Sequence, residues 1–460
     1  MKHKIGIFHL TMIGLSGVIG SGWLFASMYA AQKAGTGAYV AWIIGAVLML
    51  VFTMCLSELV SLYPKRGLLA SVASFSHNKD FAFIIGIANW FGTLTVIPAE
   101  ALATVKYLDW PHWTSLILII VYAALNSWGV KLFSKFNSTI TAFKFIVPTV
   151  TIVALLIHGV NLHNFHTAEL GNINAIMSAV IASGIIYAFN GVQMIVNFTS
   201  EAKHPKRDIP IALFLSLGLA LVLYLGLQTA FMSVANLHID YNSPFIELAA
   251  TLNLGWLVML LKADAIISPS GTGFMYIGST TRMLTAMSRE GQLPSGFNVL
   301  HPKYNVSYRS LIANTLISIV LFFVFKTWVA LILVTSSFHV ISYLAGPLAV
   351  GKLRIKMPDE KRLFNLPIHW LTCPLLFIVL SILFVMGGYD NDLWITIICI
   401  GFQALYLLLN YKGADLIKAI NRSAFLPIWL IIFTTLAHVK LNIGEIALVA
   451  LFLYYVGIGR

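Results

Sequence analysis

The sequence predicts an all-α polytopic membrane protein with about 14 transmembrane helices. Of its 460 residues, 59% are hydrophobic and only 10% are charged, and the mean hydropathy is +0.86. A soluble chain carries about 25% charged residues. The apolar runs are long and do not alternate with polar residues, which favours helices over a β-barrel. Clusters of basic residues separate the runs, as they do in membrane proteins with many spans.

Apolar segments of spanning length follow one another along the whole chain. They cover residues 6–31, 37–62, 81–107, 113–133, 137–158, 175–199, 210–235, 255–287, 310–325, 328–350, 368–387, 393–411, 424–438 and 443–458. The first run has full spanning length and no small-residue cleavage site, so we do not expect a removable signal peptide. All three cysteines lie in apolar runs, which indicates buried thiols and no disulfide framework.

The distribution of basic residues predicts the topology. With the N-terminus inside, alternate loops hold most of the 29 Lys and Arg residues, whereas the opposite loops hold only Lys33, Lys326 and Lys440. Cytoplasmic loops concentrate Lys and Arg. We therefore expect a multi-pass plasma-membrane protein with both termini in the cytoplasm. The net charge of +12 is then a topology signal and implies no nucleic-acid partner.

The first span contains the run 14–23, which holds four glycines and two serines. Each Gly costs about 1 kcal/mol relative to Ala in a helix interior, so the run favours a break at membrane depth. An unwound segment of this kind offers backbone groups to a small polar ligand. Close packing of helices through small residues is the alternative.

The fifth span contains Lys144, some ten residues from the inner end marked by Lys135. That distance is about 15 Å of helical rise, too far for easy snorkelling to the interface. Desolvation favours the neutral form of an amine, so a buried lysine can gain and lose a proton. We therefore interpret Lys144 as a functional residue, with snorkelling as the alternative.

The sixth span carries a second set of interruptions, at Gly184 and at Asn190, Gly191 and Gln193. An interhelical hydrogen bond is one explanation for such polar residues at depth, and a ligand site is the other. Two interrupted spans five apart are typical of two inverted five-helix repeats. The amides at 20–22 suit the carboxylate of a zwitterion such as an amino acid, and carbonyls of both spans suit its ammonium.

Further ionisable residues leave more than one reading open. Glu100 follows Pro98 in the third span and is either a site residue or a packing partner. Lys262 and Asp264 are expected to form a paired or interfacial set near the outer end of the eighth span. The role of Trp23 stays open.

Several motifs resemble the amino acid–polyamine–organocation (APC) transporter superfamily. The matches are Ile19-Gly20-Ser21-Gly22-Trp23-Leu24-Phe25 in the first span, Ser57-Glu58-Leu59 with Tyr63-Pro64 and Gly67, the loop 201–210, and the stretches 281–284 and 286–294. Leu68 replaces a second glycine that is usual in the family. The variant of the first-span motif with Trp23 is similar to the motif of the branch that contains aspartate–proton symporters.

The resemblance implies a core of two inverted five-helix repeats with broken helices 1 and 6. We expect the core at 1–350, its repeats at 1–158 and 175–350, and additional transmembrane helices at 351–460. The implied substrate contacts, together with the amide of Gly20, are Ile19, Ser21, Gly22, Tyr187, Ala188, Phe189 and Asn190. Phe189 is either a gate over the substrate or ordinary packing.

In some proton-coupled members a helix-5 lysine stands where sodium sits in sodium-coupled relatives. The resemblance then implies that Lys144 neighbours Gly14 and Gly17 in the first span and the stretch with Ser268 and Ser270 in the eighth. We predict a secondary active amino acid transporter, a proton symporter that works by alternating access. An amino acid or amine exchanger is the main alternative, and a transporter-fold sensor is a further one.

The sequence carries no motif of an enzyme active site and no metal-ligand cluster, so neither an enzyme nor a resident cofactor is expected. The expected partners are a small amino acid, a proton and the lipid bilayer. The residues leave open which amino acid is carried and which oligomer forms.

Overall fold

The computed structural model describes residues 5–63, 68–128, 130–159, 164–165, 172–362, 364–439 and 441–459. Side chains are described in these ranges except at 68–70, 130–142, 197 and 199–200. The positions Pro64 and Gly67 of the second-span motif therefore lie outside the described residues. Within the described part, the chain forms helices and a single isolated bridge between Ile5 and Ala202.

The first half of the chain forms helices at nearly all the predicted spans. They are α1 (Ile7–Val18), α2 (Gly22–Ala34), α3 (Gly37–Leu62), α4 (Leu68–Ser76), α5 (Lys79–Tyr107), α6 (Thr114–Ser127), α7 (Val130–His158), α8 (Ile173–Ala182), α9 (Ile185–Phe189), the 3₁₀ helix η3 (Val192–Glu201) and α10 (Pro205–Val234). Local caps define several ends. For example, the Asn78 side chain accepts from the Phe81 N–H at 2.8 Å and starts α5.

The second half continues the pattern. It contains α11 (Pro244–Thr251), α12 (Gly255–Arg289), the short η4 (Ser295–Asn298), α13 (Tyr308–Val324), α14 (Trp328–Tyr343), α15 (Ala345–Lys356), α16 (His369–Met386), α17 (Tyr389–Asn410), α18 (Gly413–Ser423), α19 (Phe425–Val439) and α20 (Ile443–Ile458). The predicted spans do not include α4, α11 and α18. These helices are short, at 9, 8 and 11 residues.

Six described helices are long and apolar enough to cross a membrane, and three bent pairs raise this number to nine. Four shorter apolar helices, which include part of α7, accompany them. The bent pairs are α1 with α2, α8 with α9 and the start of η3, and α18 with α19. The predicted class, an all-helical membrane bundle with the first and sixth spans broken, is thus confirmed.

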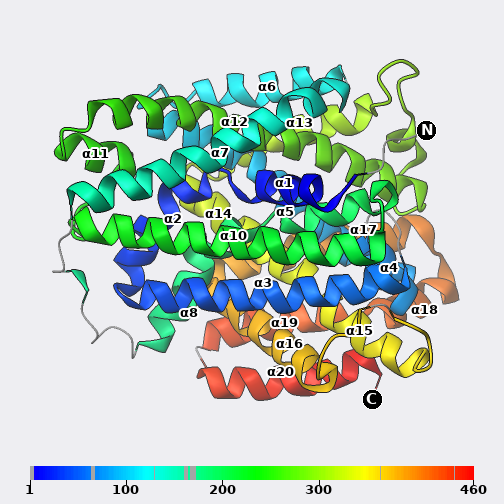
Figure 1. Cartoon of the computed structure of the whole chain (residues 1–460). Coiled ribbons are helices and arrows are strands. Elements are labelled where there is room, and N and C mark those ends of the chain that lie inside the picture. The colour runs from blue at the N-terminus through cyan, green and yellow to red at the C-terminus, as the bar shows by residue number, and fades with distance from the viewer. Residues whose placement is uncertain are drawn as a thin grey trace.

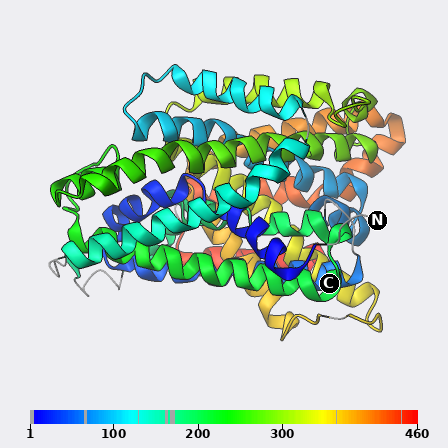
Figure 2. The same cartoon turned by 45° about the horizontal axis from the view of Figure 1, so that its top comes forward.

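Helix α5 forms the centre of the bundle and is almost entirely buried. It packs against α12 and α14, while α3 packs along α10. Figure 1 shows α3 and α10 running side by side across the molecule, with α16, α19 and α20 along one edge. Figure 2 brings α6 and α13 forward as a neighbouring pair on another edge. The broken helices α1 and α2 lie against α10 and so within the bundle.

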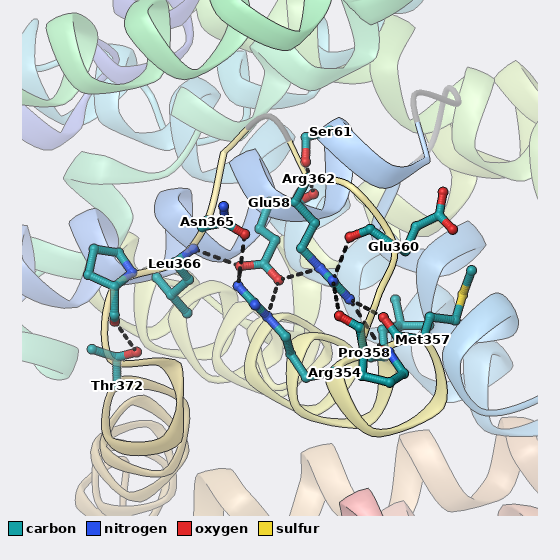
Figure 3. A network of polar contacts seen from close by, with 12 residues as sticks. Glu58, Ser61, Arg354, Met357, Pro358, Glu360, Arg362, Asn365, Leu366 and Thr372 are labelled. Atoms are coloured by element: carbon teal, nitrogen blue, oxygen red, sulfur yellow. Dashed lines mark hydrogen bonds and ion pairs between the residues drawn. The ribbon is translucent and has the colours of Figure 1, made fainter.

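A buried carboxylate holds the end of α3 to the segment that follows α15. Glu58 accepts hydrogen bonds from the Arg354 guanidinium at 2.8 and 2.9 Å and from the Leu366 N–H at 2.7 Å. Arg362 forms an ion pair with the same carboxylate at 3.1 Å. Figure 3 shows how these groups converge on Glu58. A carboxylate that is 1% exposed requires such partners, so this network explains the glutamate in the second-span motif.

Candidate functional site

The first span breaks where the glycine-rich run predicts. Helix α1 ends at Val18, α2 begins at Gly22, and the two axes differ by 56°. Ile19 adopts an extended conformation (φ −84°, ψ 94°), which ends the helical hydrogen-bond ladder. The first N–H groups of α2 have no partner in their own helix, and the positive end of its dipole lies at the break.

The sixth span has two interruptions. At the first, Gly184 has φ +88°, and α8 bends by 50° into α9. At the second, α9 ends after one turn, Asn190 is extended, and Gly191 has φ +107° before η3 begins. Both positive φ values favour glycine. The sequence marked both positions, so this prediction of the broken span is confirmed.

The two broken spans touch through backbone that only glycine permits. A Cβ on Gly191 would overlap the carbonyl oxygen of Gly17, and a Cβ on Gly22 would lie 3.3 Å from the Cα of Ala188. The Tyr224 hydroxyl of α10 lies 3.1 Å from the Val18 carbonyl oxygen and 2.9 Å from the Ala188 carbonyl oxygen, and its single proton serves both acceptors. The interrupted turns are therefore joined to each other and to α10.

Glu100 of α5 occupies the start of α2. Its carboxylate accepts from the Ser21 N–H at 2.9 and 3.2 Å and from the Tyr187 hydroxyl at 2.5 Å. The Trp328 indole N–H donates to the Ser21 hydroxyl at 2.9 Å. A Cβ on Gly20 would overlap the Glu100 carboxylate. Of the two roles left open for Glu100, the structure therefore puts it in contact with the predicted site residues Ser21 and Tyr187.

Lys144 is 1% exposed and lies beside the same break. Its ammonium donates to the Thr272 hydroxyl at 2.6 Å and to the Ser16 carbonyl at 3.3 Å. Ser16 lies between the expected neighbours Gly14 and Gly17. Thr272 in turn donates to the Ser268 carbonyl at 3.1 Å and sits 3.4 Å from the Ile19 carbonyl.

The expected neighbours of Lys144 divide into two groups. Gly14 and Gly17 lie in α1, the helix whose Ser16 carbonyl accepts from Lys144. Their own closest neighbours are Ser216 of α10 for Gly14 and Gly191 for Gly17. Ser268 is one hydrogen bond away through Thr272. Ser270 instead accepts from the Tyr122 hydroxyl at 3.1 Å. Thr272, which sequence reasoning missed, is the direct contact, and its place one helical turn after Ser268 was the available signal.

Asp264 is a further buried acid that sequence reasoning placed wrongly. It is 0% exposed and accepts from the Ser268 hydroxyl at 2.6 Å, whereas Lys262 is exposed. The expected pair with Lys262 is therefore wrong for this structure. The negative charge of Asp264 instead acts on Lys144, as does that of Glu100. Residues 262 and 264 are two positions apart, which puts their side chains on nearly opposite faces of the helix.

The remaining predicted residues lie on the far side of the second interruption. The Asn190 side-chain oxygen accepts from Gln193 at 2.5 Å and from the Tyr343 hydroxyl at 3.3 Å. Phe189 is fully buried, with its ring edge-on to Trp42 at 5.7 Å and to Tyr224 at 5.4 Å. In this conformation Phe189 packs into the core. Its possible gating role stays a prediction.

The predicted substrate residues are all buried, and even the side chain of Tyr187 is only 5% exposed. The breaks are thus closed by packing in this conformation. A ligand that binds the Ser21 N–H at the α2 N-terminus must displace the Glu100 carboxylate. The contacts of Glu100 with Ser21 and Tyr187 are the ones that such a displacement must change.

Broken helices with buried charges beside the break define a membrane transporter of small polar solutes. The family model described as "Amino acid permease" matches residues 5–405, so the chain belongs to the amino acid permease family of the APC superfamily. Members of this family are transporters, and the protein is an amino acid transporter rather than an enzyme.

Two curated relatives from Bacillus subtilis (strain 168) cover most of the chain. The glutamate/serine transporter AimA is 37% identical over 466 aligned residues, which span 94% of this chain and 86% of the relative. An aspartate-proton symporter is 29% identical over 422 residues, which span 86% of this chain and 81% of the relative. The second relative agrees with the branch indicated by the first-span motif.

Solved structures with a similar fold include variants of a manganese transporter from Eremococcus coleocola. The first has a TM-score of 0.57 at 12% identity and covers 95% of both chains. At this identity the likeness shows the fold alone. It confirms the predicted class of transporter fold, while the division of this chain into repeats stays a prediction.

Proposed function

We propose that the protein is a proton-coupled amino acid symporter that carries its substrate into the cell by alternating access. The observation that carries the proposal is the arrangement at the first break. There a buried carboxylate, Glu100, accepts from the Ser21 N–H at the start of α2, and a buried ammonium, Lys144, donates to the Ser16 carbonyl near the end of α1. Ionisable groups at membrane depth are costly and mark pathways for ions and substrates.

The substrate binds as a zwitterion at the two interrupted spans. Its carboxylate accepts from the Ser21 and Gly22 N–H groups at the positive end of α2. Its ammonium faces the Val18 and Ala188 carbonyls. At Val18 it replaces a donor, because that oxygen already accepts from the Gly20 N–H at 3.1 Å and lies beside the Tyr224 hydroxyl, which also reaches Ala188. The Tyr187 hydroxyl and the Trp328 indole are donors at the same place.

Coupling to the proton follows from competition for one N–H group. The Glu100 carboxylate holds the Ser21 N–H that the substrate carboxylate needs. Two carboxylates at one buried amide repel each other. A proton that binds Glu100 makes it a neutral acid, releases the Ser21 N–H and admits the substrate. Each substrate then enters with a proton.

Lys144 is the second group in the coupling. Its ammonium holds the end of α1 through the Ser16 carbonyl and balances the negative charges of Glu100 and Asp264. A change in the charge of either acid therefore changes how firmly α1 is held to α7 and α12. This contact provides the route by which protonation moves the broken span.

Glutamate and serine are the first substrates to test, because the 37% identical relative is named for them. We also place both termini in the cytoplasm and the protein in the plasma membrane, in agreement with the basic loops. The transporter core comprises residues 1–350, and residues 351–460 form the additional helices.

The test is uptake of labelled serine, glutamate and aspartate into proteoliposomes with and without an inward proton gradient. We expect accumulation above equilibrium only with the gradient, and its loss with a protonophore. Glu100→Gln should bind substrate but lose gradient-driven accumulation, and Lys144→Ala should lose it as well. The matched controls Asp390→Asn and Lys262→Ala change exposed charges and should accumulate substrate as the wild type does.

Full gradient-driven accumulation by Glu100→Gln would overturn the coupling step. If uptake instead requires amino acid inside the vesicles, the protein is an exchanger. Saturable binding without flux in any arm would indicate a sensor.

A further inference from the structure

A cavity of about 460 Å³ lies away from the broken helices, at the end of the bundle where α4, α15, α18 and the C-terminus meet. Figures 1 and 2 both show the C-terminus at this end. Residues from four parts of the chain line the cavity: His77, Asn78 and Phe81; Lys352 and Lys356; Asn421, Arg422, Phe425 and Ile428; and Leu453, Val456 and Gly457. We call it the α15–α20 cavity.

The charge of the α15–α20 cavity is positive. Lys352, Lys356 and Arg422 line it, and the acid beside it is Asp80, 3.6 Å from Arg422. Asp80 also accepts from the Tyr411 hydroxyl at 2.7 Å, so its charge is shared. Burial lowers the pKa of His77 to about 3, and the positive charges of Lys352 and Lys356 contribute. The wall of the cavity is therefore a neutral imidazole beside three cations.

The other side of the cavity is apolar and continues onto the outside of the bundle. Ile428 of α19 and Val456 of α20 line the cavity and are 48% and 47% exposed. Ile431 and Phe452 extend the apolar surface along the same two helices, at 54% and 68% exposed. Because these helices belong to a multi-pass membrane protein, this surface faces lipid acyl chains.

Helix α18 places the cavity at the level of the lipid headgroups. Its Ile417 and Ile420 are exposed, its Ala419 and Ser423 are buried against the protein, and Asp415 and Lys418 form an exposed polar edge. An amphipathic helix of this kind lies in the membrane interface. It ends with Arg422 at the cavity and bends by 54° into α19.

We propose that the α15–α20 cavity binds the phosphate headgroup of an anionic phospholipid, with the acyl chains along the exposed apolar surface of α19 and α20. Basic pockets between transmembrane helices on the cytoplasmic side suit such headgroups. A free phosphate ion would use the cations but gain nothing from Ile428, Val456 and the surface that continues from them. The apolar wall is therefore the reason to assign a lipid.

The test uses the delipidated full-length protein in detergent and follows its unfolding temperature during titration with phosphatidylglycerol, phosphatidylcholine or inorganic phosphate. We expect a saturable rise with phosphatidylglycerol alone. Lys352→Glu should weaken that response at least about fivefold, since each basic residue contributes about 1 kcal/mol to anionic-lipid binding and the new carboxylate adds repulsion. Lys352→Arg should restore it. Lys361→Glu makes the same charge change at an exposed position outside the cavity and should respond as the wild type does.

The lipid-free unfolding temperature of Lys352→Glu reports whether the variant folds. If that variant is destabilised, Arg422→Gln replaces it, because Arg422 is 55% exposed and lines the same cavity. Three results overturn the proposal: equal stabilisation by phosphatidylcholine, an equal effect of inorganic phosphate, or an unchanged phosphatidylglycerol response in the cavity variants. The second result would assign the cavity to a free anion.

Discussion

Ser21 shows how a single buried residue joins the parts of the site. Its N–H donates to Glu100 of α5, and its hydroxyl accepts from Trp328 of α14 and lies 3.3 Å from the Tyr187 hydroxyl of α9. Hydrogen bonds to a charged group contribute about 1.5–3 kcal/mol each. The residue therefore ties the start of α2 to three other helices, and any movement of α2 must exchange these bonds for others.

Gly191 is the position where one added methyl group tests the contact between the broken spans. We expect Gly191→Ala to lower the free energy of unfolding by about 1–3 kcal/mol, because φ +107° is strained for Ala and the Cβ would overlap the Gly17 carbonyl. Uptake should fall with it. The unfolding temperature in detergent and the initial rate of uptake measure the two effects.

Gly218→Ala is the matched control. Gly218 lies within α10 with nothing near its would-be Cβ, so Ala there should stabilise the helix by about 0.5–1 kcal/mol. Equal behaviour of the two variants would show that the Gly17–Gly191 contact is not required.

Sequence reasoning reached Lys144 because depth along a helix can be counted from the sequence. It could not choose a role for Glu100, since the side to which a helix turns depends on the packing of neighbours. For the same reason it missed Thr272 and paired Asp264 with the wrong partner. A threonine is common in helices, and only the fold brings Thr272 within 2.6 Å of the Lys144 ammonium.

At the scale of elements, the broken spans were predictable because glycine and amide residues interrupt the apolar pattern locally. The second-span motif was recognised as a pattern, but the ion pairs of Glu58 with Arg354 and Arg362 depend on residues almost 300 positions later. Helix α18 was missed because its apolar residues are too few for a span. Its amphipathic spacing was the signal that could have identified it as interfacial.

The junction between α4 and α5 gives the fold a defined sensitivity to acid. His77 is held between the Ser76 hydroxyl at 2.8 Å and the Gly457 carbonyl at 3.0 Å. Burial lowers its pKa from 6.5 to about 3, so the unfolded chain binds a proton between these values and the folded protein does not. This part of the stability is complete above pH 6.5 and is lost as the pH falls towards 3. Between pH 7 and 5 the loss is about 2 kcal/mol.

His77→Gln should remove this dependence. The measurement is the unfolding temperature at pH 7, 6 and 5 in lipid-free detergent, where the wild type should lose more than the variant. His238→Gln, which changes an exposed histidine, should keep the wild-type slope. The same slope in all three proteins would contradict the assignment to His77.

At the scale of the whole molecule, the two ends of the bundle differ in the number of basic residues that their loops and helix ends carry. Figure 1 shows the start of α1 and the end of α20 towards the same side of the bundle, the side on which α15 and α18 lie. Arg354 in the last turn of α15, Arg362 after that helix and the α15–α20 cavity lie at that end as well. The loop before α11, with the exposed Asp240, carries no Lys or Arg. This asymmetry is the physical basis of the proposed orientation, since Lys and Arg are retained in the cytoplasm.

Single added cysteines test the orientation, because the three native cysteines are at most 1% exposed and should not react. We expect Asp240→Cys to be labelled in intact cells by a membrane-impermeant maleimide. Asp359→Cys, in the basic loop after α15, should be labelled only after the membrane is permeabilised. The permeabilised sample shows that the second cysteine is reactive, and the unmodified protein gives the background. The opposite pattern would invert the topology, and with it the leaflet to which the α15–α20 cavity opens. Labelling of both positions from outside would put the two loops on the same side, so an even number of spans would separate them, contrary to the proposal.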